Sequence, residues 1–520
     1  MTDHPTIVLG SPGLSPDDVV AVARRDAPVT IGEDAAERIT ASRSVIEALA
    51  GDSRPHYGVS TGFGALARVH IPRDQRAQLQ RSLVRSHAAG TGEEVEREVV
   101  RALMLLRLNT LATGRTGVRL TTAQTYADIL NAGLTPVVHE YGSLGCSGDL
   151  SPLAHCALAA MGEGQLRDRT GTLRDSGEAL AEAGITPVVL AEKEGLALIN
   201  GTDGMLGMLL LALHDLRDLL RVADVAAAAS VEALLGTDTV FAADLQALRP
   251  HPGQASAASN IRRVLASSGL ITRAVDGEFT RVQDSYSLRC SPQVHGAARD
   301  TLAHAAAVAR IELGSAVDNP VVTLDGRVES NGNFHGAPVG YVLDFLAIAA
   351  ADVASISERR TDRFLDVSRN HGLPPFLAAD PGLDSGLMIA QYTAAGVVSE
   401  LKRLAVPASV DSIPSSAMQE DHVSMGWSAA RKLRRSVDGL ARVLAIELLA
   451  STRALDFRER DTAVAGTPAP ATAAVHALFR TEINAPATDE FLSPTITSAT
   501  AFVQGGGVLR AVENVIGTLD

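Results

Sequence analysis

The sequence contains few aromatic residues, and this shortage already limits the kinds of core that the chain can build. Aromatic residues make up 3% of the 520 residues, whereas hydrophobic residues as a whole make up 46%. The core must therefore consist largely of Ala, Leu and Val, which suits helices that pack closely together. We predict a mainly α protein that is long enough for a sizeable core and for more than one domain.

Lysine and cysteine are also scarce. Only three of the 46 Lys and Arg residues are lysines, namely Lys193, Lys402 and Lys432. A pyridoxal-dependent enzyme needs a lysine for its Schiff base, so this shortage weakens that class of function. The cysteines are equally few and widely spaced: Cys146, Cys156 and Cys290. This spacing matches neither a disulfide framework nor a zinc site, so we expect free thiols, no metal and a cytoplasmic protein.

Basic stretches and targeting segments are missing as well. The net charge is -14, and the chain lacks the basic stripe with which proteins bind phosphate backbones, so nucleic acid is not an expected partner. Residues 1–10 contain no basic region followed by an apolar run. The most apolar stretch, residues 205–213, is too short to span a bilayer. We therefore expect no membrane association.

One short segment stands out against these absences. Residues 141–150 read Tyr-Gly-Ser-Leu-Gly-Cys-Ser-Gly-Asp-Leu. If the amide nitrogen of Gly148 attacks the carbonyl carbon of Cys146, an imidazolone ring closes with loss of water, and loss of the Ser147 hydroxyl then leaves an electrophilic methylidene. Glycine at the third position allows the necessary bend, and the side chain at 146 takes no part. A tripeptide of this kind is more often an ordinary turn, so its surroundings must decide.

Helical periodicity dominates the rest of the chain. Helices are predicted over residues 32–49 and 149–160. Long helices, several of them twice the average length, are predicted over residues 205–235, 297–313, 337–358, 387–406 and 429–455. Residues 91–94, Thr-Gly-Glu-Glu, match a capping box that opens a further helix. The glycine-rich residues 161–177 predict a hairpin or turn. Helices this long and rich in Ala should pack into a bundle.

The segments between these helices contain the residues that are candidates for catalysis or substrate binding. A glycine-rich loop at residues 57–64 has the wrong glycine spacing for a dinucleotide site and is expected to act as a lid. Taken singly, each candidate has a plain structural explanation, such as an ion pair or a core aromatic residue. The candidates in chain order are Tyr57, His87, Asn200, Gln283, Tyr286, Arg289, Phe334 and Glu420.

Together with the Cys-Ser-Gly segment, these loops resemble the histidine ammonia-lyases. The resemblance extends from the Tyr57 loop to the Glu420 loop and includes the helices around them. It implies a mainly α fold with a long central helical bundle, like that of fumarase and aspartase, and a homotetramer whose active sites are shared between subunits. It also implies a smaller N-terminal domain, residues 1–115, and a bundle domain, residues 116–520, that carries the triplet and most site loops.

The resemblance further implies a reaction and a cofactor. The reaction is the elimination of ammonia from L-histidine to give trans-urocanate, the first step of histidine degradation. The cofactor is a 4-methylidene-imidazol-5-one that forms autocatalytically from Cys146, Ser147 and Gly148, with no external cofactor. Whether the substrate amine or its ring adds to the methylidene stays open.

The matching positions imply roles for the candidate residues. Tyr57 matches a base for the β-proton, and Arg289 matches the residue that holds the substrate carboxylate. Polar groups around the cofactor and the amine are matched by Asn200, Gln283 and Tyr286. Phe334 matches a wall of the pocket.

Substrate choice is expected to depend on His87 and Glu420. An imidazole needs hydrogen-bonding partners, which a phenylalanine ring would leave unpaired. Relatives that act on phenylalanine or tyrosine have other residues at these two positions, in particular Gln at the Glu420 position. Glu420 can also act in proton transfer.

Three residues depart from the pattern of many relatives: Asp203 replaces Gln, Met418 replaces Asn and Cys146 replaces Ala. The first two adjoin site residues, so they affect fine substrate preference more than reaction class. The main alternatives are an aminomutase, or an ammonia-lyase of another aromatic amino acid, that uses the same cofactor. A serine hydrolase lacks its Gly-x-Ser-x-Gly signature, and a non-catalytic helical scaffold would leave Ser147 unmodified.

Overall fold

The protein was analysed as a computed structural model that describes residues 5–52, 56, 58–62, 69–271, 283–485 and 487–520. The described chain forms two compact units. Unit 1 comprises residues 1–211, 306–344 and 407–431, and unit 2 comprises residues 212–305, 345–406 and 432–520. Four of the five boundaries between the units fall within long helices, namely α9 (Asp203–Ala233), α13 (Ser291–Leu313), α14 (Ala337–Leu365) and α16 (Gly426–Arg460). The fifth boundary, between residues 406 and 407, lies just after the helix Met388–Leu404. The division at residue 115 that the sequence suggests stays a prediction.

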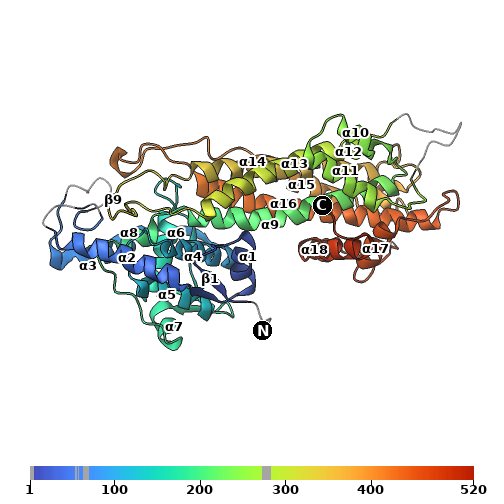
Figure 1. Ribbon diagram of the computed structural model, residues 1–520. Coiled ribbons are helices and arrows are strands. Elements are labelled where there is room, and N and C mark those ends of the chain that lie inside the picture. The colour runs from blue at the N-terminus through green and yellow to red at the C-terminus, as the bar shows by residue number, and fades with distance from the viewer. Residues whose placement is uncertain (1–4, 53–55, 57, 63–68, 272–282, 486) are drawn as a thin grey trace. The chain divides into compact units, whose positions relative to one another are not determined.

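Unit 1 combines helices with short strands (Figure 1). Its further helices are α1 (Pro16–Arg25), α2 (Glu33–Ala50), α3 (Arg76–His87), α4 (Arg97–Ala112), α5 (Leu120–Ala132), α6 (Leu150–Ala160), α7 (Ser176–Glu182) and α8 (Glu194–Ile199). Its strands are β1 (Ile7–Leu9), β2 (Val29–Ile31), β3 (Thr91–Glu94), β4 (Thr135–Pro136), β5 (His139–Tyr141), β6 (Gln165–Arg167), β7 (Leu173–Asp175), β8 (Val321–Val322) and β9 (Val328–Glu329). β1 pairs with β2 in parallel, whereas β3 with β5, β4 with β6, β6 with β7, and β8 with β9 pair antiparallel.

The described part of unit 2 is built from helices. Besides its parts of the four long helices it contains α10 (Ala243–Ala247), α11 (Pro252–Val264), α12 (Tyr286–Arg289), α15 (Met388–Leu404), α17 (Pro470–Phe479), α18 (Leu492–Gln504) and α19 (Gly507–Ile516). Short 3₁₀ helices in the two units are η2 (Arg73–Gln75), η3 (Thr239–Phe241), η4 (Pro375–Leu377) and η5 (Ser416–Met418). The mainly α fold predicted from the composition is confirmed.

Buried ion pairs join the long helices within unit 2. The guanidinium of Arg360 on α14 donates to the carboxylate of Glu447 on α16 over 2.5 and 2.9 Å, and Ser230 on α9 donates to the same carboxylate over 2.7 Å. His295 on α13 contacts Asp224 on α9 at 2.8 Å. A buried charge is stable only when it is paired and hydrogen-bonded, so these contacts align the helices that run alongside one another in Figure 1.

One predicted helix start is wrong. Residues Thr91–Glu94, predicted to form a capping box, instead form strand β3, which pairs antiparallel with β5. The next helix, α4, begins only at Arg97. The Glu94 carboxylate binds the Arg167 guanidinium over 2.7 Å, so it is not available to cap a helix. Tertiary pairing has overridden a local signal.

Two helical segments in the described part of the chain are long and apolar enough to cross a membrane by length and composition alone: Glu194–Ala233 and Ala337–Leu365. The apolar stretch at 205–213 lies within the first of these segments. The apolar window of the first segment is entirely buried inside the protein, and that of the second is 61% buried. Such burial is typical of the core helices of a folded protein.

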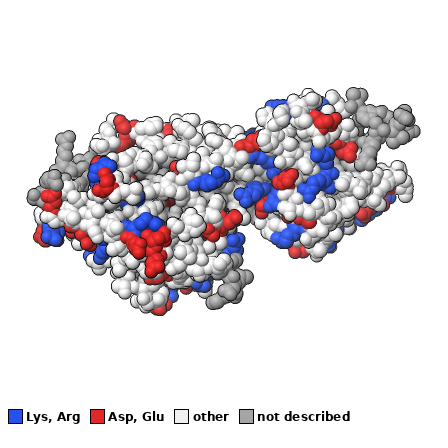
Figure 2. Space-filling model, in the orientation of Figure 1, with Lys and Arg blue, Asp and Glu red and all other residues white. Residues whose placement is uncertain are grey.

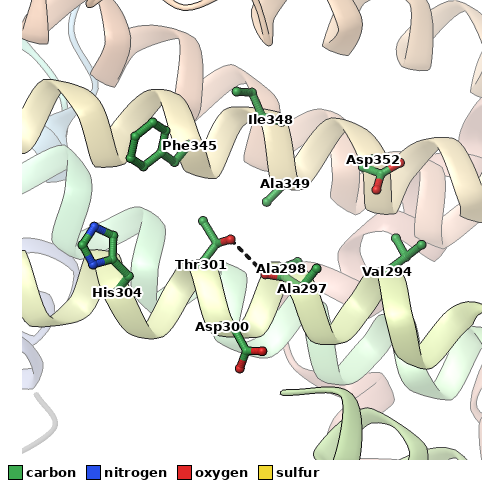
Figure 3. Close-up of a pocket in the computed structure, with 10 residues that line it drawn as sticks. All are labelled: Val294, Ala297, Ala298, Asp300, Thr301, His304, Phe345, Ile348, Ala349 and Asp352. Atoms are coloured by element: carbon green, nitrogen blue, oxygen red, sulfur yellow. Dashed lines mark hydrogen bonds between the residues drawn. The ribbon is translucent and has the colours of Figure 1, made fainter. Parts of the chain in front are cut away.

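Figure 2 shows one face of the molecule, on which acidic and basic side chains are interspersed among wide uncharged areas. Within unit 2, a groove of about 530 Å³ lies between α13 and α14 (Figure 3). Phe345 and Ile348 of α14 and Thr301 and His304 of α13 line it. Tyr341, Phe345 and Ile348 follow one another at helical spacing along α14 and are 51%, 45% and 45% exposed, so this helix presents an apolar stripe to its surroundings.

Candidate active site

The Cys-Ser-Gly triplet lies in the segment between β5 and α6, as the sequence suggests. Gly145 and Gly148 have φ angles of 65° and 79°, a conformation that residues with a side chain rarely adopt. A Cβ atom at Gly148 would lie 2.0 Å from the carbonyl oxygen of Gly201. Only glycine fits there, and its backbone is pressed directly against the turn that follows Asn200.

Asp149 attaches the triplet to the beginning of α9. Its amide donates to the Gly201 carbonyl over 2.7 Å, and its carboxylate accepts hydrogen bonds from the amides of Gly204 and Met205, each over 2.9 Å. The Ser143 hydroxyl donates to the other carboxylate oxygen over 2.9 Å. Burial raises the pKa of Asp149 to about 7, and these hydrogen bonds oppose the rise. The side chain therefore binds α9 and does not cap its own helix, α6.

Asn200 is the residue directly after α8, and a buried arginine binds its backbone carbonyl. Arg107 on α4 donates through Nη1 to the carbonyls of Ala197 and Asn200 over 3.2 and 2.9 Å, and through Nη2 to that of Val317 over 2.8 Å. The Asn200 amide donates through Nδ2 to the Asn319 carbonyl over 2.8 Å. The buried Oδ1 of Asn200 has no hydrogen-bond partner among the described residues. It is free to accept a hydrogen bond from another group.

Asp203, one of the three departures, is the counterion of this arginine. Its Oδ2 lies 3.3 Å from Arg107 Nε, and both side chains are buried. Burial raises the pKa of Asp203, and the Arg107 charge opposes the rise. A second buried pair in unit 1 joins Lys193 Nζ to Asp318 Oδ2 over 2.6 Å. Lys193, one of three candidates for a Schiff base, is thus engaged in a buried ion pair.

Glu420 and the triplet lie in direct contact although they are 273 residues apart in the chain. The Ser147 hydroxyl donates to Glu420 Oε1 over 3.2 Å, and the Cys146 thiol donates to Oε2 over 3.3 Å. The Ser415 hydroxyl donates to the same Oε2 over 2.9 Å. The structure therefore brings together Ser147, Cys146 and Glu420, three residues that the sequence identified separately.

The loop that contains Phe334 also reaches the triplet segment. The Gly336 amide donates to the Gly145 carbonyl over 3.1 Å, and Phe334, two residues earlier, is half-buried. The ring of the adjacent His335 stacks on that of His422, with centroids 5.6 Å apart and an angle of 1° between the planes. The Phe334 and Glu420 loops thus contact each other beside the triplet.

His87 is the last residue of α3, and its Nδ1 lies 2.9 Å from the Leu83 carbonyl. The chain that follows it is held by α6, because the Gly90 amide donates to His155 Nε2 over 3.1 Å. Burial lowers the pKa of His155 to about 4, so the ring is neutral at pH 7 and can accept this bond. The loop after His87 is therefore attached to the helix that begins at the triplet.

Three predicted site residues belong to unit 2. Gln283 and Tyr286 are exposed and Arg289 is partly buried. The Arg289 guanidinium carbon lies 4.8 Å from the centroid of the Tyr286 ring, a cation–π contact on the short helix α12. Tyr57 lies outside the described residues.

Sequence reasoning did not assign roles to several residues that shape this site, among them Arg107, Asp149 and Ser415. Asp149 was visible as an acidic residue at a helix start, but that position usually indicates a cap. Arg107 lies within an apolar helix, and the pattern does not indicate which carbonyl groups it binds. No sequence signal links Ser415 to the carboxylate of Glu420.

Comparison with known proteins identifies the family to which this site belongs. Residues 14–481 match the aromatic amino acid lyase family. The chain is 64% identical to the histidine ammonia-lyase of Streptomyces griseus over 515 residues, which is 99% of either chain. The chain belongs to the aromatic amino acid lyase family.

Solved structures of a histidine ammonia-lyase and of an aminomutase have the same fold. The histidine ammonia-lyase of Trypanosoma cruzi matches with a TM-score of 0.89 at 38% identity, covering 98% of this chain and 95% of that one. The tyrosine aminomutase of Streptomyces globisporus matches with a TM-score of 0.92 at 36% identity, covering 98% and 99%. Lyases and aminomutases thus share this architecture, so the fold alone does not select the reaction.

Aromatic amino acid lyases use a methylidene-imidazolone group, and the residues around the triplet fit it. The third residue of the triplet, Gly148, has no space for a side chain, and glycine is the residue that suits ring closure at this position. The Ser147 hydroxyl, which the dehydration after ring closure would remove, donates to the Glu420 carboxylate.

Proposed function

We propose that this carbon–nitrogen lyase eliminates ammonia from L-histidine to give trans-urocanate, as the name of its Streptomyces griseus relative indicates. The observation that carries the proposal is 64% identity to that histidine ammonia-lyase over the full length. The position of Glu420, whose carboxylate lies 3.2 Å from the Ser147 hydroxyl, supports it, because an imidazole ring needs a polar partner beside the reacting group.

The cofactor of this reaction is a 4-methylidene-imidazol-5-one made from Cys146, Ser147 and Gly148. It supplies an electrophile that makes the substrate amine a better leaving group. The chain's own contribution is to bend the backbone at Gly148 and to keep it against the Gly201 carbonyl. Asn200 and Gln283 are the polar groups proposed to lie around the ring and the substrate amine. The free Oδ1 of Asn200 is an acceptor, so it suits a donor such as the substrate amine.

The remaining residues bind the substrate and move its protons. Glu420 and His87 bind the imidazole, and Arg289 binds the carboxylate through its two-pronged guanidinium. Tyr57 is the base for the β-proton, with Tyr286 beside the amine and Phe334 as an apolar wall. The cation–π contact between Arg289 and Tyr286 supports a joint position for these two side chains.

Intact mass and product analysis test the proposal. The purified protein should be lighter than its sequence by two waters and should convert L-histidine to urocanate. A Ser147→Ala variant should regain one of these waters and lose nearly all activity. An unmodified mass in soluble, folded wild-type protein would contradict the cofactor, and absence of urocanate would contradict the reaction.

An aminomutase is the second candidate, favoured by the structural match to a tyrosine aminomutase. It would return the ammonia to the neighbouring carbon and yield a β-amino acid. Chromatography of the products formed from L-histidine separates the two reactions. A β-amino acid without urocanate would establish the aminomutase.

We also infer a homotetramer with shared active sites and a cytoplasmic location. The exposed apolar stripe of Tyr341, Phe345 and Ile348 on α14 supports association, because an apolar patch of this kind is usually covered by another chain. The free thiols of the three cysteines support a reducing compartment. Gel filtration that gives a monomer under dilute, active conditions would contradict the tetramer.

A further inference from the structure

The two oxygens of the Glu420 carboxylate have different partners. Oε2 accepts hydrogen bonds from the Ser415 hydroxyl over 2.9 Å and from the Cys146 thiol over 3.3 Å. Oε1 accepts one from the Ser147 hydroxyl over 3.2 Å. One oxygen is thus held by two side chains, and the other by the hydroxyl of the residue that reacts.

These partners have different fates if the cofactor forms as proposed above. Ring closure removes the Cys146 carbonyl oxygen as one water, and the dehydration that follows removes the Ser147 hydroxyl as a second, so Oε1 loses its donor and becomes free to bind a substrate. The Ser415 hydroxyl and the Cys146 side chain are not consumed. Oε2 therefore keeps its two partners after the cofactor has formed.

The Cys146 thiol is suited to remain a donor. Its side chain is buried, with 5% of the residue exposed. Burial, together with the nearby Glu420 charge, raises the pKa of the thiol to about 11. The thiol is therefore protonated at neutral pH and donates a hydrogen bond to Oε2.

The loop that carries Glu420 needs such anchors. It is closed by two backbone hydrogen bonds between Ser415 and Glu420, over 2.8 and 3.2 Å. Between them, Ser416, Ala417 and Met418 have φ angles of 51°, 52° and 70°. Three consecutive non-glycine residues in the left-handed region store strain, so side-chain contacts, from Ser415 within the loop and from Cys146 outside it, must help to hold the carboxylate in place.

We propose that Cys146 is a positioning residue for Glu420: its thiol, together with the Ser415 hydroxyl, holds Oε2 so that Oε1 faces the imidazole of the substrate. The inference rests on the proposed function and adds a second role for the triplet. Its central residue supplies the reactive carbon, and its first residue orients the group that recognises the substrate. An alanine at 146 would have no donor for this contact.

The test compares the wild type with Cys146→Ala and Cys146→Ser. Intact mass first confirms that each protein has lost two waters. We expect Cys146→Ala to raise KM for L-histidine about threefold to tenfold with kcat changed by less than about twofold, because one hydrogen bond to a binding carboxylate is lost. Cys146→Ser, which keeps a donor, should bring KM back to within about twofold of the wild type.

A matched control is Cys156→Ala, a buried cysteine on α6, which should leave KM unchanged. A wild-type KM in Cys146→Ala, or failure of Cys146→Ser to restore KM while Cys156→Ala is normal, would overturn the inference. Failure of the proposed function is recognised separately, because wild-type protein would then produce no urocanate.

Discussion

Two loops contact the triplet from different sides, and they are stabilised in different ways. The Asn200 turn, residues 200–203, is buried, and Arg107 and Asp149 hold its backbone. The Glu420 loop, residues 415–420, is largely exposed and strained, and side-chain contacts hold its carboxylate. Groups assigned to the general chemistry thus lie on a backbone fixed by burial, whereas the group assigned to substrate choice lies on a loop that a few contacts can reposition.

Removing the Arg107 side chain should destabilise the buried Asn200 turn. In Arg107→Met, the Asp203 carboxylate loses its counterion, and the carbonyls of Ala197, Asn200 and Val317 lose a donor. Loss of one partner of a buried ion pair costs about 3–5 kcal/mol. We expect a large fall in the thermal unfolding midpoint, measured by circular dichroism.

The double variant Arg107→Met, Asp203→Leu is the control, because it removes both charges. It should recover part of the loss but not all, since the carbonyls remain without a donor. A thermal midpoint of Arg107→Met equal to that of the wild type would show that the Asn200 turn does not depend on this pair.

The pH dependence of stability should report on Asp149. Its pKa is about 7 in the folded protein, against 3.8 when unfolded, so between these values the folded state binds more protons than the unfolded one. Stability is therefore lost as the pH rises through this window and is constant above it. Between pH 5 and pH 8 the loss should reach about 2–3 kcal/mol relative to Asp149→Asn, which cannot titrate.

Thermal midpoints of both proteins at pH 5, 6, 7 and 8 measure this effect. The wild type should be more stable relative to Asp149→Asn at pH 5 than at pH 8. A difference between the two proteins that stays constant over this range would show that Asp149 does not take up a proton there.

In the exposed Glu420 loop, Ser415→Ala should change the binding of L-histidine more than the stability of the protein. It removes the 2.9 Å hydrogen bond to Glu420 Oε2, and we expect KM for L-histidine to rise about tenfold or less. The thermal midpoint should change little, because the loop is largely exposed and Ser415 is only partly buried. Ser412→Ala in the same segment, whose hydroxyl instead accepts from the Val423 amide, should keep the wild-type KM. Equal KM values for the two variants would refute the assignment.

The smallest expected effect is an increase in the stability of the folded protein. Met418 is 67% exposed and has a φ of 70°, a conformation that Asn tolerates better. Met418→Asn should raise stability by less than about 1 kcal/mol, measured by denaturant unfolding. Val410→Asn, 79% exposed and outside the left-handed run, should bring no such gain. A loss of stability at Met418→Asn would indicate that the methionine side chain makes a useful contact.

Helix content was predictable because apolar periodicity is local. The long predicted helices at residues 205–235, 297–313 and 337–358 correspond to α9, α13 and α14, with ends that differ by up to seven residues. The predicted hairpin at residues 161–177 corresponds to β6 and β7. The capping box at Thr91–Glu94 failed because pairing with β5 outweighs a local capping preference.

The site was predictable as a set of residues but not as an arrangement. The triplet, Asn200, Phe334 and Glu420 were each identified, and their roles stay predictions. The partners that hold them, such as Arg107 behind Asn200 and Ser415 beside Glu420, come from distant or unremarkable positions. Buried polar groups find partners through the folded chain, and this information is not contained in a local pattern.

The sequence by itself determined the chemistry open to Cys146, Ser147 and Gly148, because ring closure involves only neighbouring backbone atoms and one hydroxyl. It also determined the helical class through a composition that favours close helix packing. Only the tertiary structure decided that Glu420, 273 residues away, lies against Ser147, and that the Cys146 thiol contacts the same carboxylate. The physical reason is that a hydrogen bond acts over about 3 Å of space, whatever the separation along the chain.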